Sequence, residues 1–150
     1  MKKVFISARV CSFLLYNLLN MYQVFVYGTL RSGGSNAFRM VGTTSLGAAT
    51  IQAKLYRVHE DFPGVILSAN TDDFVVGEVY ADVSEEQLLQ LDIYEGCDAS
   101  MPEEERIYQR VKVTAYLESG EPVELYLWEY IREVSEEDRV MGGDWLLELA

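Results

Sequence analysis

Apolar and polar residues alternate over much of the chain, which is the pattern of β-strands that bury one face. The clearest case is Tyr108–Leu117, where Val111, Val113 and Ala115 share one side. Further strands are predicted at Val24–Tyr27, within Leu46–Val58, at Val65–Leu67, at Phe74–Ala81 and at Val123–Ile131. A turn at Glu118–Glu121 joins the last two strands into an antiparallel hairpin.

One helix is predicted to begin after Ser84, whose hydroxyl suits an N-cap. Gln87 stands three residues later and would complete a capping box, and Leu88 would face the core. Gly96 stands where the end of a helix favours a residue that can adopt positive φ. Glu95 is therefore expected at the C-terminal end of this helix. A further helical turn is predicted at Ser135–Asp138.

The size and composition of the chain indicate one globular domain. Its 150 residues are 49% hydrophobic and 24% charged, which is enough to bury a core without disulfide or metal staples. The predicted strands and helix indicate an α+β fold with a small, mixed and strongly curved β-sheet. We expect this domain to span residues 21–150.

Residues 1–20 have a different composition. Lys2 and Lys3 precede an apolar run, Val10–Leu15, as in a signal peptide, but Arg9 interrupts the apolar stretch and no A-x-A cleavage site follows. The run is also too short to span a bilayer. We expect an N-terminal extension or over-called start, with a cleaved or anchoring targeting segment and a genuine added element as alternatives.

The net charge of −12 argues against a nucleic-acid-binding protein, because phosphate binding needs clustered Lys and Arg. The charges are unevenly distributed, since no acidic residue precedes Glu60. Arg31 and Arg39 therefore lie in a positively charged part of the chain, which suits an anionic small ligand.

Metal and disulfide chemistry are not expected. Cys11 and Cys97 form no CxxC pair, and His59 is the only histidine, a composition that fits a reducing, cytoplasmic compartment. Cys97 with His59 also lacks the setting of a thiol nucleophile.

Two segments are candidates for chemistry. Tyr27-Gly28-Thr29-Leu30 follows a buried strand, and a glycine-containing turn there can present backbone amides to a carboxylate or an oxyanion. Glu95 lies at the negative end of a helix dipole, where partial burial would also raise its pKa toward the range of a general acid or base. Asp92, three residues earlier, either raises that pKa further or caps another group.

Several blocks of this sequence resemble the gamma-glutamylcyclotransferase-like family. Val24–Leu30 is similar to its strand and YG(S/T)L loop, and Leu91–Gly96, followed by Tyr108-Gln109-Arg110, is similar to its LDxYEG and YxR segments. Phe62-Pro63-Gly64, Gly77–Tyr80 and Gly143-Asp144-Trp145 also match in order and spacing. The resemblance covers about residues 22–146.

This resemblance implies a small β-barrel with peripheral helices and an enzyme that needs no cofactor. Such an enzyme releases 5-oxoproline from a small-molecule gamma-glutamyl amine or peptide, as in glutathione or gamma-glutamylamine metabolism. By position, Glu95 would be the catalytic acid/base and Tyr27, Gly28, Thr29 and Leu30 would hold the glutamyl group. Tyr130 would line the pocket by the same analogy.

Two other functions are compatible with the sequence. A non-catalytic module of the same fold could bind a small metabolite, and Asp92 with Glu95 could form a glycosidase-like carboxylate pair, although their spacing of one helical turn is short for that. The sequence does not distinguish among leaving groups such as a free amine, a lysine ε-amine, cysteinylglycine or an antibiotic intermediate. It predicts no oligomeric state.

Overall fold

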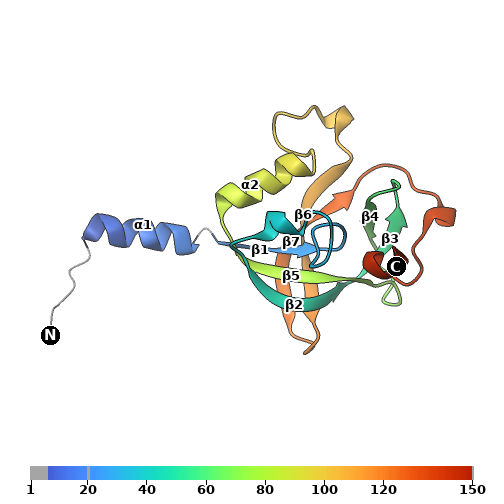
Figure 1. Ribbon diagram of the computed structural model, residues 1–150, viewed down its shortest axis with the longest axis horizontal. Helices are drawn as coiled ribbons and strands as arrows, with labels where there is room; N and C mark the ends of the chain where they lie inside the picture. Colours follow the sequence, from blue (N-terminus) through green and yellow to red (C-terminus); the bar gives the residue numbers. More distant parts are fainter. Residues whose placement is uncertain (1–6, 20, 150) are drawn as a thin grey trace.

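The computed structural model describes residues 7–19 and 21–149 (Figure 1). Its strands are β1 (Tyr22–Val26), β2 (Thr44–Ile51), β3 (Ala53–Arg57), β4 (Pro63–Leu67), β5 (Val75–Val83), β6 (Tyr108–Leu117) and β7 (Pro122–Tyr130). Its α-helices are α1 (Ala8–Leu19), α2 (Glu85–Tyr94) and α3 (Trp145–Glu148). Its 3-10 helices are η1 (Ala37–Met40), η2 (Glu103–Glu105) and η3 (Glu136–Asp138).

The main sheet is a closed barrel with the strand order β1-β5-β2-β6-β7. β1 pairs antiparallel with β5 and parallel with β7, so the sheet is mixed. β3 and β4 form a separate two-stranded sheet at one end of the barrel (Figure 1). The predicted α+β fold with a small, strongly curved sheet is confirmed, and so is the barrel with peripheral helices that the family resemblance implies.

The second half of β1, Val24–Val26, is buried on both of its faces, which explains why its sequence is continuously apolar. Phe25 belongs to the core inside the barrel. Val24 and Val26 point the other way and pack in a second core with Leu88 and Leu91 of α2. Because β1 is held from both sides, the loop that follows it starts from a fixed position.

The segment Leu46–Val58, predicted as one strand region, is divided into β2 and β3. Ile51 and Ala53 are both buried, while Gln52 between them is exposed and donates a hydrogen bond from Nε2 to the carbonyl oxygen of Ser68 at 2.9 Å. The alternation of buried and exposed positions continues through this corner. A period of two therefore could not reveal that β3 leaves the barrel to pair with β4.

α2 begins as predicted, with one correction to its capping. The Ser84 hydroxyl accepts a hydrogen bond from the Gln87 amide at 3.1 Å, which is the N-cap half of the motif. The Gln87 side chain does not return to Ser84. It donates from Nε2 to the carbonyl oxygens of Arg39 at 3.0 Å and Val41 at 3.2 Å, so it ties α2 to η1 and the segment after it.

Part of the predicted N-terminal extension is helical. Figure 1 shows α1 projecting away from the barrel. Residues 1–6 and 20 lie outside the described residues, and the assignment of residues 1–20 to an extension or a targeting segment stays a prediction. Across residues 7–19 and 21–149, no helix combines the length and the apolar character needed to cross a membrane.

Candidate active site

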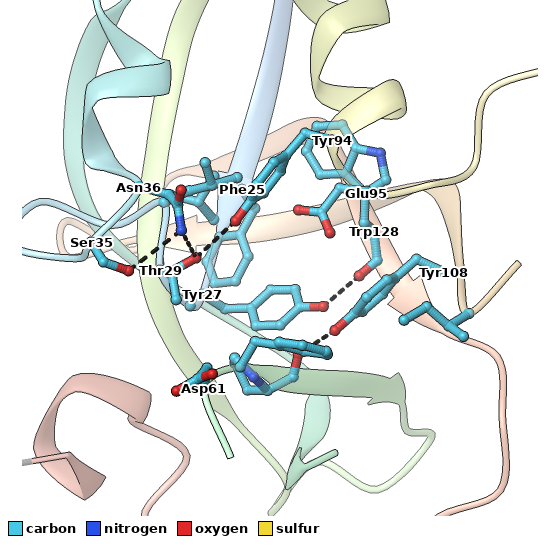
Figure 2. A pocket seen from close by; sticks show the side chains of 16 residues that line it. Phe25, Tyr27, Thr29, Ser35, Asn36, Asp61, Tyr94, Glu95, Tyr108 and Trp128 are labelled. Atoms are coloured by element: carbon cyan, nitrogen blue, oxygen red, sulfur yellow. Dashed lines mark hydrogen bonds between the residues drawn. The ribbon is translucent and has the colours of Figure 1, made fainter. Parts of the chain in front are cut away.

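A pocket of about 300 Å³ opens beside the end of β1 (Figure 2). Its walls come from the loop after β1, the C-terminal end of α2, the turn before β4, and strands β6 and β7. They include Tyr27–Leu30, Phe62, Pro63, Tyr94, Glu95, Tyr108 and Trp128. Ligand pockets are usually roughly 300 to 1,000 Å³, so this one suits a small molecule.

The segment Tyr27–Leu30 forms one wall, where the sequence predicted a ligand loop. Gly28 lies against Pro63, and a Cβ at position 28 would come within 2.9 Å of two ring carbons of that proline. In the described part of the chain, the amide N–H groups of Gly28, Thr29 and Leu30 form no hydrogen bond. Three successive backbone donors of the pocket-lining segment are therefore without a partner among the described residues.

The end of α2 places Glu95 at the opposite wall. Glu95 is the C-cap residue, Gly96 adopts a φ of 68°, and the Gly96 and Cys97 amides donate to the carbonyl oxygens of Ile93 at 3.1 Å and Asp92 at 3.0 Å. These two bonds form a Schellman motif, which reverses the chain directly after Glu95. Figure 2 shows the Glu95 carboxyl pointing into the pocket, between the side chains of Tyr94 and Tyr27.

Burial raises the pKa of the Glu95 carboxyl from 4.5 to about 7. The positive charge of Arg39 lowers this pKa, and the negative charge of Asp92 raises it. The direction predicted from the sequence is confirmed, with desolvation as the main cause. A carboxyl with a pKa near 7 can both accept and donate a proton at neutral pH.

Two buried tyrosines support the floor of the pocket and remain neutral. The Tyr27 hydroxyl donates to the carbonyl oxygen of Trp128, and the Tyr108 hydroxyl donates to that of Pro63, each at 2.6 Å. Burial raises the pKa of both phenols well above the ordinary value for tyrosine. They hold the pocket walls together, and Glu95 is left as the lining group whose pKa is placed near neutrality.

The two walls are joined by a short polar chain. The Thr29 and Tyr94 hydroxyls are hydrogen bonded at 3.2 Å, and Asn36 donates from Nδ2 to the Thr29 hydroxyl oxygen at 3.2 Å (Figure 2). The backbone N–H of Asn36 also donates to the Thr29 carbonyl oxygen at 2.9 Å. The loop carrying the free amides is thereby fixed relative to the residue beside Glu95.

Asp92 has a structural role in this arrangement. Its Oδ1 accepts from Trp128 Nε1 at 2.9 Å and lies 3.5 Å from Arg110 Nε, so it is buried and already paired. A glycosidase-like pair with Glu95 needs two carboxyls facing a substrate bond, and Asp92 is not among the residues that line the pocket.

The thiol alternative is not supported either. Burial raises the pKa of Cys97 to about 11, and its Sγ donates to Asp92 Oδ1 at 3.8 Å. His59 is half exposed, stacks on Phe62 and accepts a hydrogen bond from the Asp61 amide. Cys97 is a weak nucleophile in this state, and the contacts of His59 lie elsewhere.

The two arginines that suggested an anionic ligand have different environments. Arg31 is buried and forms ion pairs with Glu78 at 3.0 Å and Asp144 at 2.7 Å, so its charge is neutralised inside the protein. Arg39 is exposed, and its guanidinium lies 4.1 Å from the centre of the Tyr94 ring. Arg31 therefore does not offer a free charge to an anionic ligand, and the expectation of local positive potential stays a prediction for Arg39.

Tyr130 does not line the pocket in the part of the chain that the structure describes. Its ring packs edge-on against Tyr108 at 5.6 Å, and its Cβ would lie 2.7 Å from a Cβ added to Gly64. Tyr130 thus packs behind Tyr108, which lines the pocket.

Sequence reasoning did not single out Asn36, Tyr94 or Trp128 as site residues. Asn36 lies in a short polar segment and Trp128 lies in the predicted strand Val123–Ile131, so neither stands out in the sequence as a site residue. The sequence offers one indication for these three residues. Asn36 stands seven residues after Thr29, and a short polar loop often folds back on its own start.

The chain has relatives at the level of sequence. Residues 24–147, well over half of the chain, match the family described as "Gamma-glutamyl cyclotransferase, AIG2-like". A protein of Methanocaldococcus jannaschii named "Putative gamma-glutamylcyclotransferase" is 30% identical over 110 residues, which are 73% of this chain and 85% of that protein.

Solved structures share the fold. The AIG2-like protein of mouse matches with a TM-score of 0.62 and 26% identity over 79% of this chain and 82% of that one. YkqA of Bacillus subtilis matches with a TM-score of 0.64 and 20% identity over 83% of this chain, which spans only 39% of YkqA. The family match over residues 24–147 shows that the chain belongs to the gamma-glutamyl cyclotransferase, AIG2-like family.

Proposed function

We propose that this protein is a cyclotransferase that releases 5-oxoproline from a gamma-glutamyl amine or peptide. The observation that carries the proposal is the juxtaposition of two features in one pocket. The Glu95 carboxyl, with a pKa near 7, points into the pocket that Gly28, Thr29 and Leu30 also line, and the amides of these three residues have no partner among the described residues. Family membership supports the reaction class.

In the proposed reaction, Glu95 accepts a proton from the substrate's α-ammonium group. The freed α-amine attacks the γ-carbonyl carbon and closes a five-membered ring, and the carbonyl oxygen becomes an oxyanion. When the carbon–nitrogen bond to the leaving amine breaks, Glu95 returns the proton to that amine. The ring nitrogen then loses its second proton to Glu95, which passes it to the departed amine. The products are 5-oxoproline and the leaving amine in its ammonium form, and the carboxyl is ionised again for the next turnover.

The structure offers a physical basis for each step. Holding the substrate in a folded conformation makes the attack intramolecular, which can lower the barrier by about 7 kcal/mol or more. A backbone amide that meets the developing oxyanion can contribute roughly 3 kcal/mol. Proton transfer by Glu95 would add about 100-fold to 10,000-fold in rate.

The substitution Glu95→Gln tests the proposal, because it keeps the shape of the side chain and removes proton transfer. We expect 5-oxoproline release, measured by mass spectrometry across a panel of gamma-glutamyl compounds, to fall by about 100-fold or more. Glu86→Gln, an exposed acid in the first turn of the same helix, should leave the rate unchanged. Release at the wild-type rate from the Glu95→Gln variant would disprove the catalytic role.

The same panel also tests the alternative of a non-catalytic binding module. Such a module would bind a gamma-glutamyl compound without releasing the cyclic product. Calorimetric binding together with no turnover of any compound by the wild-type protein would replace the proposed function with that one.

A further inference from the structure

The hydroxyl groups of Thr29 and Tyr94 form a bridge between two walls of the pocket. Thr29 belongs to the pocket loop, Tyr27–Leu30, Tyr94 is the last residue of α2, and both residues line the pocket. Their hydroxyl oxygens are 3.2 Å apart, and Asn36 Nδ2 donates to Thr29 Oγ1 at 3.2 Å (Figure 2). Within the described residues, neither hydroxyl forms any other hydrogen bond.

This bridge leaves one hydroxyl hydrogen without a partner. The two hydroxyls carry two hydrogens, and one of them lies between the two oxygens, whichever residue donates it. The other hydrogen has no acceptor among the described residues, so the pair can present one O–H donor at the pocket wall. The hydrogen bond from Asn36 into Thr29 also strengthens the pair as a donor, because hydrogen bonds in a chain polarise one another.

Most other side-chain donors of the pocket are already bonded to protein. Tyr27 and Tyr108 donate to backbone carbonyl oxygens, and Trp128 Nε1 donates to Asp92. Ser35, which is exposed, carries the remaining hydroxyl of the described lining. The bridge therefore adds a side-chain donor to the backbone N–H groups of the pocket loop that have no partner among the described residues.

Such a group of donors suits a carboxylate. A carboxylate has two oxygens with about four lone-pair sites, so it can accept from several donors at once. Glu95 directly follows Tyr94, and its carboxyl points into the pocket between the Tyr94 and Tyr27 side chains (Figure 2). The α-carboxylate and the α-ammonium group of a gamma-glutamyl substrate share one carbon atom. Donors that hold this carboxylate therefore bring the ammonium group toward Glu95.

Both residues of the bridge are held in place by further contacts. The Arg39 guanidinium lies 4.1 Å from the centre of the Tyr94 ring, a contact that is favoured electrostatically. The backbone N–H of Asn36 donates to the Thr29 carbonyl oxygen at 2.9 Å. Because the donor is already oriented, less conformational entropy is lost when a ligand binds.

We propose that the Thr29–Tyr94 bridge binds the α-carboxylate of the substrate and so makes the enzyme specific for gamma-glutamyl groups in which this carboxylate is free. Tyr94 is then a substrate-binding residue, and Asn36 is a positioning residue that acts through Thr29. The proposal rests on the function proposed above and states a chemical requirement of the same site. A substrate without the α-carboxylate gains nothing from the bridge.

Two substrates that differ only in this group test the proposal. One is the gamma-glutamyl compound of the panel that is turned over fastest, and the other is its 4-aminobutyryl counterpart, which lacks the α-carboxylate and closes to 2-pyrrolidinone. We expect Tyr94→Phe to lower kcat/KM for the gamma-glutamyl compound by about tenfold or more, mainly through KM, because a hydrogen bond to a charged group is lost. The counterpart should change by less than about twofold.

Matched variants separate recognition from shape. Thr29→Val should act as Tyr94→Phe does, and Thr29→Ser, which keeps the hydroxyl, should retain most of the activity. The Thr29→Val, Tyr94→Phe double variant should lose little more than either single variant, because the two hydroxyls act as one unit. Tyr116→Phe is the control: Tyr116 is exposed on β6 and is not among the described residues that line the pocket, so both substrates should react as in wild type.

Binding gives a readout that needs no turnover. 5-Oxoproline and 2-pyrrolidinone also differ only in the carboxylate, and ¹H–¹⁵N NMR titration measures the affinity of the protein for each. We expect wild type to bind 5-oxoproline more tightly than 2-pyrrolidinone. Tyr94→Phe should weaken the binding of 5-oxoproline by about tenfold and leave that of 2-pyrrolidinone unchanged.

Each outcome bears on one of the two proposals. Equal losses for both substrates in Tyr94→Phe, or no loss for the gamma-glutamyl compound, would overturn the role of the bridge. If wild type turns over no gamma-glutamyl compound, the cyclotransferase function fails, while the NMR titration still decides whether the bridge recognises the carboxylate. Equal affinity of wild type for the two lactams would contradict that recognition. If Thr29→Val does not fold, Tyr94→Phe alone provides the comparison.

Discussion

Glu95 occupies the C-cap of α2, next to the turn through Gly96, and its carboxyl points into the pocket (Figure 2). A glutamate at the end of an acidic helix is ordinarily exposed and ionised. Here the surroundings of the carboxyl include Tyr27 of the pocket loop and Tyr108 on β6, which are far from Glu95 in the sequence or on another element. The reactivity proposed for Glu95 therefore carries a cost in stability, because the folded protein disfavours its charged form.

That cost predicts how stability depends on pH. The folded-state pKa of Glu95 is raised from 4.5 to about 7, so its contribution is fully present below pH 4.5 and is lost as pH rises through 7. Between pH 5 and pH 8 this one group should lower the free energy of unfolding by roughly 2 to 3 kcal/mol.

Urea denaturation of wild type and Glu95→Gln at both pH values measures this contribution, because glutamine does not titrate. The variant should gain stability relative to wild type on going from pH 5 to pH 8. Parallel pH dependence of the two proteins would show that the carboxyl is solvated in the folded state.

At the scale of elements, the sequence predicted what local periodicity and capping determine. The strands, the start of α2 at Ser84 and its end at Gly96 all follow from patterns within a few residues of each other. The corner at Gln52 was not predicted, because alternation continues through it. The Gln87 side chain was also assigned wrongly, since its partners lie on η1 and directly after it, 48 and 46 residues away.

The candidate site also combines features that the sequence indicates with features that depend on long-range packing. The placement of Gly28 and Glu95 at one pocket was expected from the family resemblance. Their physical setting depends on long-range packing, such as Gly28 against Pro63 and Tyr130 behind Tyr108. No pattern within a single segment indicates such contacts.

The end of α2 can be tested through Gly96. Its φ of 68° is a left-handed conformation, and a Cβ there would meet the Met101 side chain at 3.4 Å, which is ordinary contact. Backbone strain alone should therefore make Gly96→Ala about 1 kcal/mol less stable, measured by urea denaturation. The activity should fall as well, because relaxation of the turn moves Glu95.

Gly96→Asn is the matched variant, since asparagine tolerates left-handed φ better than alanine. It should retain more of both stability and 5-oxoproline release. Equal losses in the two variants would mean that the added side chain, not the backbone conformation, causes the defect.

For the whole molecule, Arg31 connects three parts that are far apart in the sequence. It lies just after the pocket loop, and it binds Glu78 of β5 through Nε at 3.0 Å and Asp144 before α3 through Nη1 at 2.7 Å. Glu78 also accepts from the Ser32 amide at 3.0 Å. The barrel wall and the C-terminal segment thereby fix Arg31 and Ser32, which directly follow the pocket loop.

Removing this arginine should therefore affect both stability and the pocket. Arg31→Met leaves two largely buried carboxylates without their cation, which should lower the free energy of unfolding by about 3 kcal/mol. kcat/KM should also fall, because the loop loses its support, whereas Lys112→Met breaks only an exposed pair with Glu124 and should cost about 1 kcal/mol or less.

A double variant separates the buried charges from the lost packing. If uncompensated charge is the cause, Arg31→Met combined with Glu78→Gln should be more stable than the sum of the two single effects, because one of the two orphaned carboxylates is gone. Additive losses in urea denaturation would instead indicate that Arg31 acts through its packing, with its charge secondary. The coupling energy thus tells whether the barrel and the pocket loop are joined mainly by charge.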